Sequence, residues 1–301
     1  MLLKLPPELI PFFLQQFLSA KEYKQIVDSC KTLKELKFRT VYLKLNASVS
    51  RKIYEQDESV KNRIFSLVLD PKVQISLNLS YFRDISDGAV VSELVHAVNF
   101  SKCVTLNNVS KLGQLTNLNL SGCPFVTSVS ALKNVKYLNL SNCVNVVDVS
   151  MLGNVYSLNL SYCYLITDVS ALGNVHILNL SECHRISSVN MLGNVYNLTL
   201  TGCKAISDVS GLSNVHILNI QNCTNITDIS NLSAVYSLNI SGCKQLMDFS
   251  FIENSRIRIL YISFCSQITD LSPFVRVQRL FMIGCHQITD TSILPRTIIV
   301  R

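Results

Sequence analysis

Cysteine is the residue with the widest chemistry in this sequence, and its spacing is regular. From Cys123 to Cys243 one cysteine occurs every 20 residues, and the chain holds eleven in all. Thiols that converge on one point hold metal ions or act as nucleophiles, and paired thiols form disulfides. A thiol at one position of each repeat is spread along an axis instead. We therefore expect small buried apolar side chains, without disulfides and without a metal.

Aspartate also recurs with the repeat. Calcium-binding repeats place glycines beside such an aspartate, whereas here Thr or Ser usually precedes it and Val or Ile usually follows. We expect each carboxylate to accept a hydrogen bond from the backbone of its own turn. The serines two places later are expected to act as N-caps of short helical turns. The aspartates are Asp148, Asp168, Asp208, Asp228, Asp248, Asp270 and Asp290, and the serines include Ser150, Ser170, Ser210 and Ser230.

Catalysis is not expected. The five histidines, at positions 96, 176, 184, 216 and 286, lie in different repeats, so spacing brings no Cys–His or Ser–His–Asp set together. Glycine loops that hold phosphates are absent from the sequence. The sequence therefore predicts neither an enzyme nor a bound cofactor.

The repeat itself predicts the fold. One unit reads V-K-Y-L-N-L-S-N-C from Val135 to Cys143, and the pattern L-x-x-L-x-L-x-x-C resembles the cysteine-containing leucine-rich repeat. The resemblance implies an α/β solenoid with a parallel sheet on its concave face. Because 20 residues leave little room for a full helix, we expect extended chain or short 3-10 turns on the convex side. About eleven such rungs span residues 73–301, and residues 297–300 read as a last strand with an open edge.

The N-terminal segment does not repeat. Residues 1–40 read as a small helical module, and the run Leu-Pro-x-Glu-Leu-Ile with the apolar residues after it resembles an F-box. In that family the motif binds the small adaptor subunit of cullin-RING ubiquitin ligases. The resemblance assigns adaptor binding to Leu5, Pro6, Leu9, Ile10, Phe13, Phe17, Leu18 and Cys30. The alternative is a helical cap over the first rung. Residues 41–72 are a transition, with a strand expected at 42–45 and a helix at 55–69.

Alternation along each strand places one unusual strip on the outer side of the sheet. Aromatic, basic and aliphatic side chains there have the composition of a protein interface. The alternative is cross-strand packing between neighbours without a binding role. Because the strip holds histidines, target binding should be weaker or altered between about pH 7 and 5.5. The predicted target-binding residues are Lys136, Tyr137, Tyr156, His176, Ile177, Tyr196, His216, Ile217, Tyr236 and Arg258.

The combination resembles F-box/LRR proteins, and the near-identity of the repeats resembles members encoded by giant DNA viruses. This implies a non-catalytic substrate receptor of an SCF-type ligase in the ubiquitin-conjugation pathway. The alternative is a leucine-rich-repeat scaffold or adhesive module with no ligase role.

Composition limits the partners and the location. Asn and Ser interrupt every apolar run, so no stretch reaches the ~18 apolar residues of a membrane span. Pro6, Pro7 and Pro11 interrupt what would be the core of a secretion signal. Residues 101–250 hold seven Lys and Arg against six Asp and Glu, which disfavours nucleic acid. We expect a cytoplasmic protein, in the host cytoplasm or nucleus if viral, and the sequence predicts no particular oligomeric state.

Overall fold

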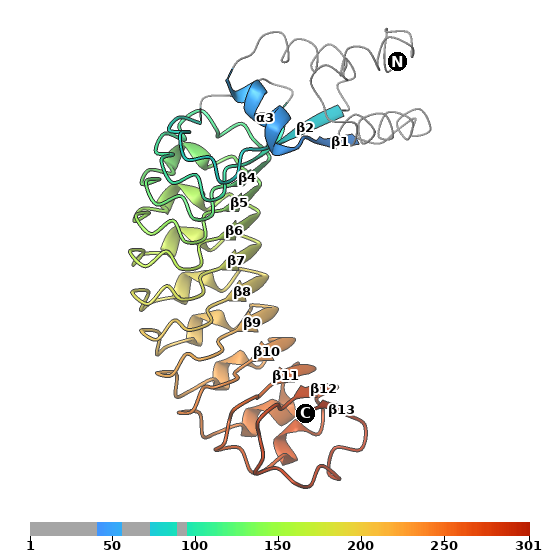
Figure 1. Ribbon diagram of the computed structural model, residues 1–301. Helices are drawn as coiled ribbons and strands as arrows, with labels where there is room; N and C mark the ends of the chain where they lie inside the picture. The colour runs from blue at the N-terminus through green and yellow to red at the C-terminus, as the bar shows by residue number, and fades with distance from the viewer. Residues whose placement is uncertain (1–40, 56–72, 89–94) are drawn as a thin grey trace, which may run out of the picture.

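The strands that the structure describes lie parallel in one 13-stranded sheet, in which their order is their order in the sequence. The computed structural model describes residues 41–55, 73–88 and 95–301. The described rungs stack into an arc whose inner side is lined by the strands (Figure 1). The predicted solenoid with a concave parallel sheet is therefore confirmed. The strands are β1 Val41–Lys44, β2 Val73–Asn78, β3 Val95–Asn99, β4 Asn117–Asn119, β5 Tyr137–Asn139, β6 Ser157–Asn159, β7 Ile177–Asn179, β8 Asn197–Thr199, β9 Ile217–Asn219, β10 Ser237–Asn239, β11 Ile259–Tyr261, β12 Arg279–Phe281 and β13 Ile298–Val300.

Short 3-10 helices form the convex side, as the 20-residue period predicts. They are η1 Ser130–Leu132, η2 Ser150–Leu152, η3 Ser170–Leu172, η4 Asn190–Leu192, η5 Ser210–Leu212, η6 Ser230–Leu232, η7 Ser250–Asn254 and η8 Ser272–Phe274. The last residue of most of these turns is a leucine with no exposed surface, which closes the core opposite the sheet. Within the described ranges, no helix is both long and apolar enough to cross a bilayer.

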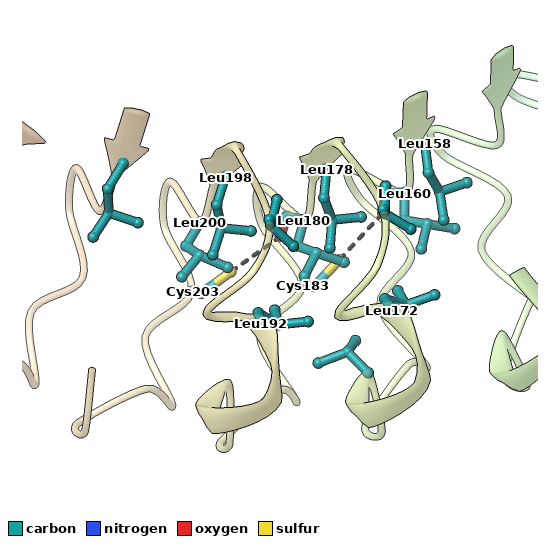
Figure 2. Packing of buried hydrophobic residues seen from close by; sticks show 14 of the residues in the cluster. Leu158, Leu160, Leu172, Leu178, Leu180, Cys183, Leu192, Leu198, Leu200 and Cys203 are labelled. Carbon is teal, nitrogen blue, oxygen red and sulfur yellow. Dashed lines mark hydrogen bonds between the residues drawn. The ribbon is translucent and has the colours of Figure 1, made fainter. Parts of the chain in front are cut away.

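The core is a stack of identical layers. In the rung of β7, Leu178 and Leu180 point inward from the strand and meet Leu172 from η3, and all three have 0–1% of their surface exposed. Figure 2 shows the same side chains repeated from rung to rung. Because each layer packs only against its neighbours, stability in such an array comes from nearest-neighbour contacts.

We call the cysteines that recur once per rung, from Cys103 to Cys285, the column cysteines. Each of them is buried and donates a hydrogen bond to a backbone carbonyl of the preceding rung. The Sγ of Cys183 lies 3.2 Å from the carbonyl oxygen of Leu160, and the Sγ of Cys203 lies 3.0 Å from that of Leu180 (Figure 2). The ten cysteines that the structure describes are all buried free thiols. The predicted role of these cysteines as small buried side chains is confirmed, and the hydrogen bond adds a polar function that the sequence did not reveal.

The recurring aspartates accept hydrogen bonds from the backbone of their own turns, as predicted. Asp168 Oδ1 accepts a hydrogen bond from the backbone N–H of Ser170 at 2.9 Å, which holds the pKa of this exposed carboxyl below its ordinary value. The prediction that the serines are N-caps is wrong. Ser170 is the first residue of η3, and Val169, which precedes it, makes no side-chain cap bond. Asp168, two residues before the helix begins, instead accepts the backbone N–H of Ser170.

Two irregularities in the repeat length are absorbed locally. The extra residue before β3 shifts the register between β2 and β3 after Ile75. The two extra residues near Glu253 lengthen η7 to five residues. The insertion therefore lies on the convex side, away from the strands.

A helix that the sequence did not predict connects β1 to β2 and packs against β2. The expected strand at 42–45 is β1, and α3 spans Ala47–Tyr54, so only its C-cap Glu55 belongs to the predicted helix 55–69, the rest of which lies outside the described residues. α3 buries Val49 and Ile53 against the first strands. Ser50 Oγ donates to the Leu45 carbonyl and accepts from the Asn78 N–H at 2.9 Å.

Arg51 ties α3 to the loop after β2. Its guanidinium donates two hydrogen bonds to the Asp84 carboxylate, one of them 2.8 Å long, and lies 4.9 Å from the centre of the Phe82 ring. This arrangement holds the pKa of Asp84 below its ordinary value. Phe82, which takes the place of the column cysteine in this rung, is thus held between the core and a cation.

The residue before each column cysteine adopts a left-handed backbone, with φ between 58° and 72°. Glycine and asparagine accept this conformation, but Glu182 at φ 62° pays a steric penalty of roughly 1–2 kcal/mol. We expect Glu182→Asn to raise the free energy of unfolding by about 1 kcal/mol, because Asn142 and Asn222 already hold this position in other rungs. Urea unfolding measures the difference. Glu182→Gln keeps the strain and is the control, and equal stability of the two variants would contradict the strain argument.

Candidate protein-interaction surface

Five aromatic side chains stack along one edge of the concave sheet, each from the residue immediately before a strand. We call Tyr156, His176, Tyr196, His216 and Tyr236 the aromatic ladder. Neighbouring ring centroids are 4.8, 4.9, 4.8 and 5.1 Å apart, and the ring planes differ by 6° to 21°. The distances match the separation of neighbouring parallel strands, so the sheet itself sets the stacking distance. The cross-strand packing proposed as an alternative is therefore present.

Stacking leaves the edges of the rings free. Tyr156 and Tyr196 are 40% and 42% exposed although the faces of the inner rings are covered by their neighbours. A ligand that requires an open ring face, such as a nucleobase or a methylammonium group, finds none at the inner rungs. The phenol hydroxyls and imidazole nitrogens remain available for hydrogen bonds. Because neighbours already hold each ring, binding costs little side-chain entropy.

The first ring of the ladder is covered by two further predicted residues. Tyr137 meets Tyr156 edge to face at 5.8 Å, and Lys136 Nζ lies 5.4 Å from the centre of the Tyr137 ring and 5.5 Å from that of Tyr156. These contacts place a fixed positive charge at the N-terminal end of the ladder.

The remaining predicted target-binding residues lie beside the ladder. Ile177 is 37% exposed on β7, and Ile217 is half-buried at the equivalent place on β9. Arg258 follows Tyr236 in the same column, but its Nη1 donates to the carbonyls of Ser255 and Ile257 at 3.2 and 2.9 Å. All ten predicted residues thus share one side of the sheet, and Arg258 is partly engaged by backbone.

Sequence reasoning missed a hollow on the concave face across β2 to β6. It has a volume of about 380 Å³ and is lined mainly by asparagines and small residues, with Tyr137 at its edge. The Oδ1 of Asn119, Asn139 and Asn159 each accepts the backbone N–H two residues later, at 2.9–3.0 Å. Asn117 Oδ1 is buried without a hydrogen-bond partner. The signal was present in Ala97 and Ser157, small residues at outward positions.

A second aromatic group, at the loops that follow the strands, was also missed. Tyr164 and His184 stack at 5.9 Å, and Tyr162 meets Tyr164 edge to face. His184 Nδ1 donates to the Gly202 carbonyl at 3.0 Å, while its Nε2 lies 3.4 Å from the Glu182 carboxylate. Comparing the residues that directly follow the cysteine in successive repeats would have revealed this group in the sequence.

The buried thiols are poorly reactive at neutral pH. Burial raises the pKa of Cys183 to about 11 and that of Cys203 to about 12, so both thiols stay protonated at neutral pH. In the part of the chain that the structure describes, no three His, Cys, Asp or Glu side chains are grouped to hold a metal ion. The predicted adaptor-binding residues, all within 1–40, lie outside the described residues.

Comparison with solved structures relates the solenoid to known folds. An internalin (inlF) from Listeria monocytogenes superposes with a TM-score of 0.53 at 21% identity, covering 79% of this chain and 81% of that one. The Rad7–Elc1 complex from yeast gives a TM-score of 0.43 at 15% identity, covering 97% and 95%. No protein-family model and no curated protein sequence matches the chain. The similarity to the internalin establishes the fold alone, and the chain folds as a leucine-rich-repeat solenoid.

Proposed function

We propose that the chain is a non-catalytic substrate receptor of an SCF-type cullin-RING ubiquitin ligase. In this role the F-box-like segment binds the adaptor subunit, and the aromatic ladder with its flanking residues binds a target protein. The observation that carries the target-binding half is the ladder: five preorganised rings with exposed polar tips on a concave face. Tyrosine and arginine are among the residues that contribute most to protein interfaces.

Binding of the purified full-length protein to a recombinant ligase adaptor subunit tests the receptor role. We expect binding that is lost in Leu9→Asp with Phe13→Asp, because two charges are placed among apolar residues whose sequence resembles the family's adaptor contact. The matched control is Ile177→Asp with Ile217→Asp, two equivalent changes beside the aromatic ladder. The control variant should bind the adaptor as the wild type does.

Two results would overturn the proposal. One is the absence of adaptor binding by a protein whose circular dichroism shows it folded. The other is equal binding by the wild type and by the Leu9→Asp, Phe13→Asp variant. Either result would favour the scaffold alternative.

A further inference from the structure

The charges of the described solenoid are segregated between its two sides. The residue before each of the strands β4 to β13 and the two outward positions of each of these strands include no Asp or Glu. The aspartates lie instead in the turns that lead into the 3-10 helices of the convex side. The same positions hold three cations, Lys136, Arg258 and Arg279. The full charges at these positions are therefore all positive, although residues 101–250 are nearly neutral as a whole.

The uncharged polar groups of this face include a row of free hydrogen-bond donors. The asparagines of the strands use Oδ1 for their own turns, and the Nδ2 donors of Asn119, Asn139 and Asn159 make no hydrogen bond within the described residues. The ladder adds phenol hydroxyls at its exposed ring edges. A row of donors flanked by cations matches a ligand that carries negatively charged acceptors.

We propose that the ladder edge of the concave face binds an acidic, extended peptide segment of the partner protein. This inference rests on the proposed function and names the chemical class of its target. The ring-to-ring distances place Tyr236 about 20 Å from Tyr156 along the ladder, and Lys136 and Arg258 each lie one rung further out. At about 3.3 Å per residue, an extended segment of roughly nine residues spans these two cations.

The same geometry disfavours nucleic acid as the occupant. Single strands bind to open aromatic faces on which bases stack, and the inner rings of the ladder have their faces covered. Phosphate backbones also require many cations, whereas the outward strand positions from β4 to β12 hold three. A carboxylate-bearing peptide needs only the tips of the rings and the two flanking cations.

Fluorescence anisotropy with a labelled dodecapeptide of alternating Glu and Gly tests the proposal on the full-length protein at 50 mM salt. We expect Lys136→Glu with Arg258→Glu to weaken binding at least about tenfold, and Lys111→Glu with Lys204→Glu, two exposed lysines off the concave face, to leave it within about twofold.

Three outcomes would overturn the proposal: equal binding of a Gln-for-Glu peptide, an equal loss in both charge-reversal variants, or tighter binding of a dodecamer of deoxythymidine. The two proposals fail separately. A protein that binds the ligase adaptor but not the acidic peptide keeps the receptor role and loses this inference. One that binds the acidic peptide but not the adaptor keeps this inference and loses the receptor role.

Discussion

Iodoacetamide at pH 7.5 should alkylate the column cysteines of the native protein at least about 300-fold more slowly than an exposed thiol. The reactive species is the thiolate, and a thiol with a pKa of about 11, such as Cys183, is ionised about 300-fold less at this pH than one with the ordinary value of about 8.5. Burial of Cys183 and Cys203, both with 0% exposed surface, slows the reaction further. Mass spectrometry of peptides after timed alkylation measures the rate at each site.

The same protein in concentrated urea is the control, since all eleven cysteines should react there at similar rates. In the native protein Cys285, which lies in the last cysteine-bearing rung and is 5% exposed, should be the first column thiol to react. Rapid alkylation of Cys183 or Cys203 under native conditions would show that the central rungs open, and would contradict the packed layers of Figure 2.

The free energy of unfolding should fall steeply as the pH rises above about 8.5. Burial raises the pKa of the folded thiols, to about 11 for Cys183 and about 12 for Cys203, above the ordinary value of about 8.5. The unfolded chain therefore releases these protons at lower pH than the folded chain, so stability is complete below pH 8.5 and decreases above it. At pH 10 the loss is about 2 kcal/mol for each such thiol. Urea unfolding between pH 7 and 10.5 measures it.

Cys183→Ala with Cys203→Ala separates the thiols from the tyrosines and lysines that also titrate in this range. The variant should be less stable at pH 7, because the Leu160 and Leu180 carbonyls each lose one of two hydrogen-bond donors and keep only a backbone N–H. Its stability should fall less steeply with pH, by about 1 kcal/mol per pH unit for each thiol removed. An unchanged slope would mean that these thiols ionise within the folded rungs.

Repetition made the fold predictable from the sequence. A period of 20 with inward leucines has one packing solution, because a rung cannot bury its apolar face without a neighbour. The same reasoning predicted the 3-10 turns and the aspartate hydrogen bonds, which depend on contacts within one or two residues. α3 was missed because its polar sequence holds only two buried apolar residues, Val49 and Ile53, which are too few to show a helical period. Their burial depends on strands further along the chain.

The sequence predicted which residues lie on the candidate surface, but not how their side chains pack there. Alternation along the strands placed Tyr196 and His216 on one side of the sheet, and the structure agrees. It could not predict whether the rings would stand apart or stack, because that depends on side-chain rotamers and on the separation between neighbouring strands. Arg258 illustrates the same limit, since its bonds to backbone carbonyls follow from the longer turn at η7.

The sequence by itself determined the solenoid, the buried thiol column and the outward position of the aromatic strip, because these follow from periodicity and from the alternation of a strand. Tertiary structure alone decided that the ladder rings cover one another's faces and that the Nδ2 donors of Asn119, Asn139 and Asn159 are left without a partner among the described residues. The physical reason is that these properties arise between rungs, where side chains 20 residues apart meet at about 5 Å.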